Sequence, residues 1–127
     1  MGESGSPYGR FRRALDRREP IAALSAAAEL QHVALTDALE LLLLFRDRDR
    51  ARYPRAVLRW HGRLCRGVRA VSLSEAAAVL ALLAAVADSA DRSPARALAE
   101  LLNGRALDQP ARILVRWAEE RSADHST

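Results

Sequence analysis

The sequence predicts an all-α protein, a compact single-domain bundle of about seven helices joined by short loops. Alanine and leucine, both strong helix formers, dominate the 127 residues, whereas β-branched residues that favour strands are sparse. Apolar residues recur with helical rather than alternating spacing. Helix start and stop signals, such as Ser93-Pro94 and Asn103-Gly104, separate the apolar segments.

These signals divide the chain into seven expected helices. Their approximate ranges are residues 8–18, 20–32, 35–47, 49–67, 73–87, 93–103 and 109–121. We expect one helical domain, residues 8–121, between two disordered tails, residues 1–7 and 122–127. A short array of α-hairpins is the alternative architecture, because two pairs of segments resemble each other. Their offsets of 38 and 56–57 residues disagree, so similar helix caps explain the likeness more simply.

Each of the first three expected helices has a recognisable pattern. In the first, Tyr8, Phe11 and Leu15 stand on one face. Pro20 opens the second, since proline suits a first turn, and the alanines that follow let a neighbouring helix approach closely. In the third, Thr36 can cap the N-terminus. Five consecutive apolar residues near its end predict burial on more than one side.

The fourth expected helix is the most strongly patterned segment. Between Asp49 and Glu75 the chain holds seven arginines and no acidic residue. Steps of about 100° per residue place five of these arginines on one stripe: Arg52, Arg55, Arg59, Arg63 and Arg66. The other side is apolar around His61 and carries Tyr53, Val57, Leu58, Trp60, Leu64, Cys65 and Val68. Pro54 either kinks this helix or starts it afresh, and that choice decides whether Arg52 belongs to the stripe.

The last three helices are marked mainly by their ends. Gly67 suits a left-handed residue at the end of the fourth helix, and Asn103-Gly104 ends the sixth. Residues 72–75 match a capping box that starts the fifth helix. The fifth is apolar on every face, so we expect it to be buried at the geometric centre. In the seventh, Leu114 and Trp117 face inward.

Composition and charge say more about the cellular compartment of the protein than about its function. All 20 basic residues are arginine, which is typical of GC-rich coding and discounts the arginine-rich composition as a functional signal. The distribution is more informative, because residues 50–74 carry +7 and the remainder −3. One cysteine excludes an internal disulfide and favours a reducing, cytoplasmic compartment. The N-terminus lacks an apolar core and the longest apolar run is too short for a membrane span.

His61 and Cys65 could share a contact, because they stand four residues apart on one helical face. They could be metal ligands, or a nucleophile with its base. We favour a core histidine with a hydrogen-bond partner and an inert buried thiol, because zinc needs three or four ligands and no third is spaced to join them. The sequence also lacks a phosphate loop, paired carboxylates and a Ser-His-Asp arrangement. It therefore predicts a protein that is not an enzyme, with no cofactor and no metal.

Several short segments resemble a group of small α-helical proteins of high-GC Gram-positive bacteria. The segments are Arg52-Tyr53, Arg59 to Arg63, Leu35 to Leu39 and Leu73 to Ala76. The resemblance covers residues 11–87. The group has no established activity, so the resemblance implies a helical domain and no catalytic residue.

The leading hypothesis is a non-enzymatic protein-interaction or regulatory module, in which a protein partner docks at the fourth helix. The candidate interaction face consists of Arg52, Arg55, Arg59, Trp60, Arg63 and Arg66. The alternative is binding of nucleic acid or another polyanion through the arginine stripe, although no aromatic platform for bases is interleaved. A plain solvated face, neutralised by acids of neighbouring helices, competes with both. An enzyme using His61 is a distant third, and no membrane or small-molecule substrate is evident.

Overall fold

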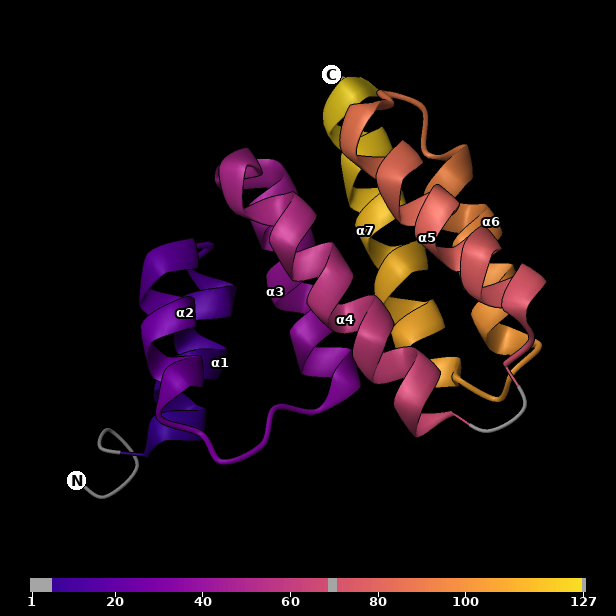
Figure 1. Cartoon of the computed structure of the whole chain (residues 1–127). Helices are drawn as coiled ribbons and strands as arrows, with labels where there is room; N and C mark the ends of the chain where they lie inside the picture. The colour runs from indigo at the N-terminus through magenta and orange to yellow at the C-terminus, as the bar shows by residue number, and fades with distance from the viewer. Residues whose placement is uncertain (1–5, 69–70, 127) are drawn as a thin grey trace. The chain divides into compact units, whose positions relative to one another are not determined.

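The computed structural model describes residues 6–68 and 71–126, and this part of the chain contains seven α-helices and no strand (Figure 1). The helices are α1 (Pro7–Asp16), α2 (Pro20–Ala28), α3 (Leu35–Arg48), α4 (Tyr53–Gly67), α5 (Leu73–Asp88), α6 (Ser93–Asn103) and α7 (Asp108–Ser126). A 3₁₀ turn, η2 (Arg50–Arg52), precedes α4. The predicted all-α fold is confirmed.

The chain divides into two compact units, Met1–Tyr53 and Pro54–Thr127. In the first unit α1 packs on α2, and both helices contact α3. In the second unit α6 packs against α5 and α7. Helices therefore pack mainly on their neighbours in sequence, as short connections between helices require. The expectation of a single domain over residues 8–121 stays a prediction.

The core of the first unit follows the expected pattern with one exception. Phe11 is fully buried, whereas Tyr8, one turn earlier on α1, is exposed. The alanines of α2 reach the core through Ala23, whose small side chain lets a neighbouring helix approach closely. The apolar run from Leu41 to Phe45 in α3 is buried throughout, which confirms burial on more than one side.

Ion pairs between helices join the surface of the first unit. On α1, Arg12 Nη1 lies 2.6 Å from Glu40 Oε2 and 3.1 Å from Asp37 Oδ1, both on α3. Hydrogen bonding to Glu40 raises the pKa of Arg12 above its ordinary value. Just after α1, Arg18 Nη2 lies 2.9 Å from Asp47 Oδ2. Each of these arginines is therefore held by a carboxylate from another helix.

The start of α5 confirms the predicted capping box. Ser72 Oγ accepts a hydrogen bond from the Glu75 N–H at 3.1 Å, and Glu75 Oε1 accepts one from the Ser72 N–H at 3.0 Å. Arg105, from the connection after α6, also binds the Glu75 carboxylate. These two contacts, the backbone hydrogen bond first, lower the pKa of Glu75 below its ordinary value.

The expectation that α5 is buried on every side is wrong. One face is buried, through Val79, Leu83 and Val86. The opposite face is exposed; it carries Leu73, Ala77, Ala81 and Ala84, together with the polar residues Ser74 and Asp88. Alanine forms helices readily and exposes little apolar area per residue, so an alanine-rich face can remain in water. An apolar pattern all round the helix therefore does not require burial all round.

Two helices end with a left-handed residue that is not glycine. Arg18 (φ 60°) follows α1 and Ala106 (φ 61°) follows α6. Backbone hydrogen bonds of the Schellman pattern close both ends. Gly67 and Gly104 have no positive φ, so the expectation for Gly67 is wrong, although α4 and α6 end where these glycines predict.

The break between α2 and α3 is longer than expected. α2 ends at Ala28 instead of near residue 32, and Ala34 precedes α3 without a side-chain cap. Thr36 lies inside the first turn, so the prediction that it caps α3 is wrong. Asp37 in the same turn binds Arg12, and its negative charge lies at the positive end of the helix dipole.

Both ends of the described chain are more helical than expected. Ser6 caps α1 by accepting a hydrogen bond from the Gly9 N–H at 3.2 Å, and Pro7 is the first helical residue. Of the expected tail over residues 1–7, residues 1–5 lie outside the described residues. The helix α7 continues to Ser126, so its expected end near residue 121 is wrong, and Thr127 lies outside the described residues.

Candidate functional site

The start of α4 decides which arginines share its surface. Pro54 is the second residue of α4, where the missing N–H of proline removes no helical hydrogen bond. The chain therefore starts a fresh helix after η2. Arg52 lies in η2, binds Asp49 and belongs to the first unit. Arg52 is therefore not part of the α4 stripe, which corrects the candidate interaction face.

One face of α4 is buried, and it includes a residue that we expected at the candidate interaction face. Trp60 is only 2% exposed, and Tyr53, Val57 and Leu64 are buried beside it along the helix. At about 100° per residue, Trp60 lies some 40° from Leu64 and so shares the apolar face. A side chain this enclosed has almost no surface to offer to a partner. Trp60 is therefore a core residue and is removed from the candidate face.

The opposite face of α4 carries three exposed arginines. Arg55, Arg59 and Arg66 project within about 40° of one another, and we call them the α4 arginine row. No carboxylate in the described part of the chain pairs with any of them. Arg63 lies on the flank, is half-buried and interacts with other groups of the chain, so it is outside the row. Arg69 lies outside the described residues.

Gly62 shapes the centre of the arginine row. A Cβ added at Gly62 would lie 3.3 Å from Arg66 Nη1, so the Arg66 guanidinium lies over this glycine. Long helical side chains point toward the N-terminus, which brings the Arg66 charge back by one turn. Arg59 stands one turn before Gly62, so Gly62 lies between these two arginines along the helix. A glycine inside a helix costs about 1 kcal/mol relative to alanine, and its missing side chain leaves the space that the Arg66 guanidinium occupies.

Beside the arginine row, two residues predicted to be buried are exposed. Leu58 is 62% exposed and Cys65 is exposed as well. Both lie between the arginine row and the side of α4 that faces α5, at about 60–80° from Arg55. The outer surface of α4 therefore combines an apolar strip with a cationic one. Sequence reasoning missed this strip because it divided the helix into two halves rather than three sectors.

His61 links α4 to α5 rather than serving Cys65. Its Nε2 lies 2.7 Å from the backbone oxygen of Ala76 and 3.8 Å from Cys65 Sγ. A carbonyl oxygen can only accept, so Nε2 carries the hydrogen and donates a hydrogen bond to the Ala76 oxygen. The nitrogen nearest the thiol is then unable to take a proton from it. In the described residues no group of three or more His, Cys, Asp or Glu side chains could hold a metal ion.

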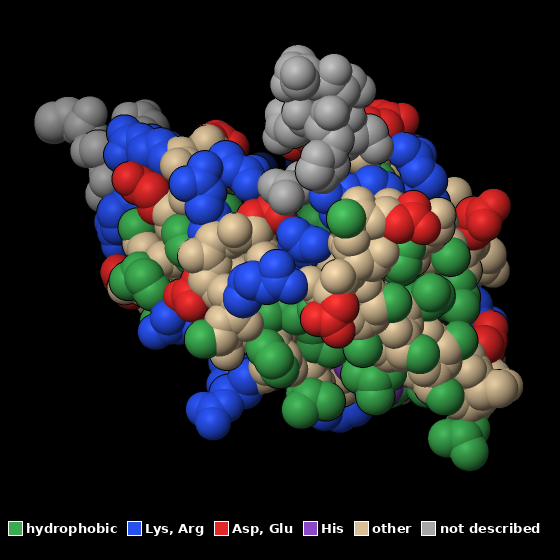
Figure 2. Space-filling model, turned by 90° about the horizontal axis from the view of Figure 1, so that it is seen from above, with side chains coloured by type: hydrophobic (Ala, Val, Ile, Leu, Met, Phe, Trp, Pro, Cys, Tyr) green, Lys and Arg blue, Asp and Glu red, His purple; other side chains and the backbone are tan. Residues whose placement is uncertain are grey.

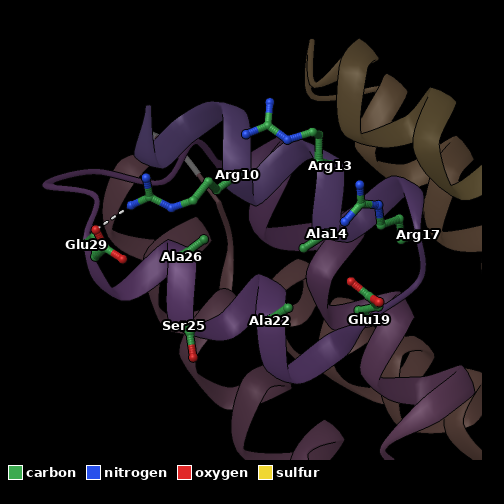
Figure 3. Close-up of a pocket in the computed structure, with 9 residues that line it drawn as sticks. All are labelled: Arg10, Arg13, Ala14, Arg17, Glu19, Ala22, Ser25, Ala26 and Glu29. Carbon is green, nitrogen blue, oxygen red and sulfur yellow. Dashed lines mark hydrogen bonds and ion pairs between the residues drawn. The ribbon is translucent and has the colours of Figure 1, made fainter. Parts of the chain in front are cut away.

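A second feature, not expected from the sequence, lies between α1 and α2 (Figure 3). It is an open pocket of about 410 Å³ with a floor that includes Ala14, Ala22 and Ala26. The pocket is also lined by arginines of α1 and its C-cap, and by the two carboxylates that flank α2: Arg10, Arg13, Arg17, Glu19 and Glu29. Arg10 Nη2 binds Glu29 Oε1 at 2.6 Å across one end. Two carboxylates thus offset much of the arginine charge.

Two features of the sequence are consistent with this pocket, although they do not predict it alone. The three arginines recur at i, i+3 and i+7, which puts them on one side of α1 and its C-cap. The alanine content of α2 predicts that a neighbour can approach it closely. Local patterns do not show that the arginine face of α1 lies next to α2, because that pairing depends on how the two helices pack.

Comparisons with protein-family models, curated proteins and solved structures found no match to this chain. The resemblance to small helical proteins of high-GC bacteria therefore stays a prediction. None of the helices in the described part of the chain combines the length and the apolar character needed to cross a membrane.

Proposed function

We propose that this chain is a non-enzymatic interaction module that binds an acidic protein partner through the α4 arginine row. The observation that carries the proposal is the exposure of three guanidinium groups on one helix face without a carboxylate partner in the described part of the chain. Other exposed arginines without such a partner in that part, such as Arg96 and Arg112, stand singly on α6 and α7.

Guanidinium groups recognise carboxylates through paired, charge-assisted hydrogen bonds. An exposed arginine keeps its hydration and its rotamer freedom until a partner arrives, so an isolated pair adds little affinity. Three arginines on one helix face, spread over about three turns, can engage several carboxylates at once, and the local excess of positive charge speeds the encounter. The row is therefore better suited to an acidic segment than to a single small anion.

The surroundings of the row favour a protein over a nucleic acid. Leu58 is 62% exposed beside the row, and an apolar side chain gains free energy from an apolar contact that a phosphate backbone does not supply. Binding of single strands uses exposed aromatic rings on which bases stack. Both aromatic residues of α4, Tyr53 and Trp60, are buried.

The proposal is tested with two labelled probes of equal charge, an acidic peptide of glutamate and leucine in random order and a DNA oligonucleotide, single-stranded or duplex. At about 0.15 M salt, where charges are screened beyond roughly 8 Å, we expect the peptide to bind more tightly in fluorescence anisotropy. Tighter binding of the oligonucleotide, with an affinity that falls steeply as salt rises, would support the polyanion alternative instead. Binding of neither probe would overturn the proposed function.

A further inference from the structure

We infer that the partner is an amphipathic helix with one acidic edge, which lies along an apolar surface shared by α4 and α5. This inference rests on the proposed function and specifies the chemistry of the partner. The α4–α5 apolar surface consists of Leu58, Cys65, Leu73, Ala77, Ala81 and Ala84. Figure 2 draws hydrophobic side chains in green and shows that many of them are exposed on the face in view.

The hydrogen bond between His61 and Ala76 fixes where the two helices meet. Leu58 stands one turn before His61 on α4, and Leu73 stands one turn before Ala76 on α5. The two helices run in opposite directions along this junction (Figure 1). One turn back along each helix therefore leads in opposite directions along the junction. A helix laid along it would meet Leu58 on one side of the His61–Ala76 hydrogen bond and Leu73 on the other side.

The exposure of the two leucines is unusual for this chain. In its described part four large hydrophobic side chains are exposed: Tyr8, Ile21, Leu58 and Leu73. Leu73 is 88% exposed, the highest value of the four, and Leu58 follows at 62%. Both belong to the α4–α5 apolar surface. Apolar area at this surface is available for burial by a partner, at about 25 cal/mol per Å².

Charge complementarity determines how the partner is oriented. The arginine row borders the α4–α5 apolar surface along α4, whereas α5 contains no arginine. The first-turn carboxylate of α5, Glu75, is already engaged by Ser72 and Arg105. The partner therefore needs acidic residues along the edge that faces α4, and none along the edge that faces α5. An acidic amphipathic helix with its charges on one side has this pattern.

The geometry of the surface favours a helix over an extended strand. A strand is usually recognised by adding to the edge of a sheet, and the described part of this chain contains no strand. The exposed residues Ala77, Ala81 and Ala84 of α5 have small side chains, so another helix axis can approach to about 8 Å. Leu58 and Leu73 then provide the larger contacts, on either side of the His61–Ala76 hydrogen bond.

The test uses two synthetic peptides of identical composition, glutamate and leucine, each about 18 residues long so that a helix can form. One is ordered as an amphipathic helix with an acidic edge, and the other is scrambled. Their affinities for the full chain are measured by fluorescence anisotropy with wild type, with Leu58→Ser plus Leu73→Ser, and with Ile21→Ser. Ile21 is the matched control, because it is an exposed aliphatic residue on α2.

We expect the ordered peptide to bind wild type about tenfold more tightly than the scrambled peptide. The double leucine variant should lose that advantage while its affinity for the scrambled peptide stays unchanged, and Ile21→Ser should behave as wild type. Equal binding of both peptides to wild type would overturn the amphipathic-helix inference and leave the proposed function standing. Binding of neither peptide would overturn both.

A second copy of the chain is the competing occupant of the same surface. Sedimentation of the chain alone should show a monomer at the concentrations used for peptide binding. A dimer that disappears in the Leu58→Ser plus Leu73→Ser variant would show that the surface is covered by another copy. That result would overturn the inference of a separate helical partner.

Discussion

Arginines in the first unit and arginines on the outer face of α4 differ in whether a carboxylate contacts them. Arg12 on α1 contacts two carboxylates of α3, and Arg18 contacts a third. Arg55, Arg59 and Arg66 are exposed on one helix and pair with no carboxylate in the described part of the chain. The residue type is the same in both places, so the difference lies in what surrounds it.

This difference separates arginines that hold the fold from arginines that remain available for binding. The ion pairs of Arg12 join two helices, so their loss leaves two partly buried carboxylates close together. The arginine row contacts no such group, so its charges are already solvated and its removal changes little in the fold. Arginine content alone, in a chain without lysine, could not make this distinction.

The largest effect is expected for Trp60→Ala, which tests whether α4 has separate buried and exposed faces. Trp60 is 2% exposed, so truncation should leave a cavity and lower the free energy of unfolding by about 3–5 kcal/mol. Urea denaturation followed by circular dichroism measures this change. A variant with wild-type stability would instead return Trp60 to the interaction face.

Arg12→Met and Arg59→Met compare the two kinds of arginine directly. Arg12→Met should lower the free energy of unfolding by about 1–3 kcal/mol, because Glu40 and Asp37 lose their charged hydrogen-bond donor. Arg59→Met is the matched control and should change stability by less than about 0.5 kcal/mol. The same denaturation assay measures both variants. Equal losses would remove the contrast between the two regions.

A smaller effect is expected at the start of α5, where Ser72→Ala removes the hydroxyl of the capping box. Loss of such a cap typically costs about 1 kcal/mol. The backbone N–H of residue 72, the largest cause of the lowered pKa of Glu75, remains in this variant, whereas the Ser72 side chain, which also lowers it, is lost. The pKa of Glu75 should therefore rise part of the way toward its ordinary value of 4.5. A carbon-detected NMR titration of the Glu75 carboxyl in both proteins measures this shift.

The sign of the associated pH dependence follows from the lowered pKa of Glu75. The folded state binds fewer protons at this carboxyl than the unfolded state does, so the interaction stabilises the fold fully above the ordinary pKa of 4.5. That stabilisation is lost as the pH falls through the lower pKa of the folded state. An unchanged titration midpoint in Ser72→Ala would mean that the Ser72 hydroxyl does not influence this carboxyl.

Local patterns predicted the parts of the fold that depend on neighbours in sequence. The capping box from Ser72 to Glu75 spans four residues, so it can be recognised without knowledge of the packing. Contacts between distant residues are different. Arg12 pairs with Asp37 and Glu40 across 25 and 28 residues, and no local pattern reveals such pairs.

The candidate site was predicted in part. Helical periodicity placed Arg55, Arg59 and Arg66 together, but it could not show whether acids of other helices neutralise them. It assigned Leu58 to the buried side, because apolar character was taken as a sign of burial. The exposed face of α5 was missed for the same reason. Which apolar faces are covered depends on how the helices pack, and the sequence pattern alone does not decide it.

The role of the arginine row is tested most directly by comparing two variants, each with two arginines changed to glutamate. The measurement is their affinity for the random-order peptide of glutamate and leucine at about 0.15 M salt. Arg59→Glu plus Arg66→Glu changes the arginine row, whereas Arg96→Glu plus Arg112→Glu makes the same charge change at exposed sites on α6 and α7. We expect at least a tenfold loss of affinity in the first variant and less than about a threefold loss in the second. Equal losses in both variants would show that net charge alone governs binding, and would contradict a specific role for the arginine row.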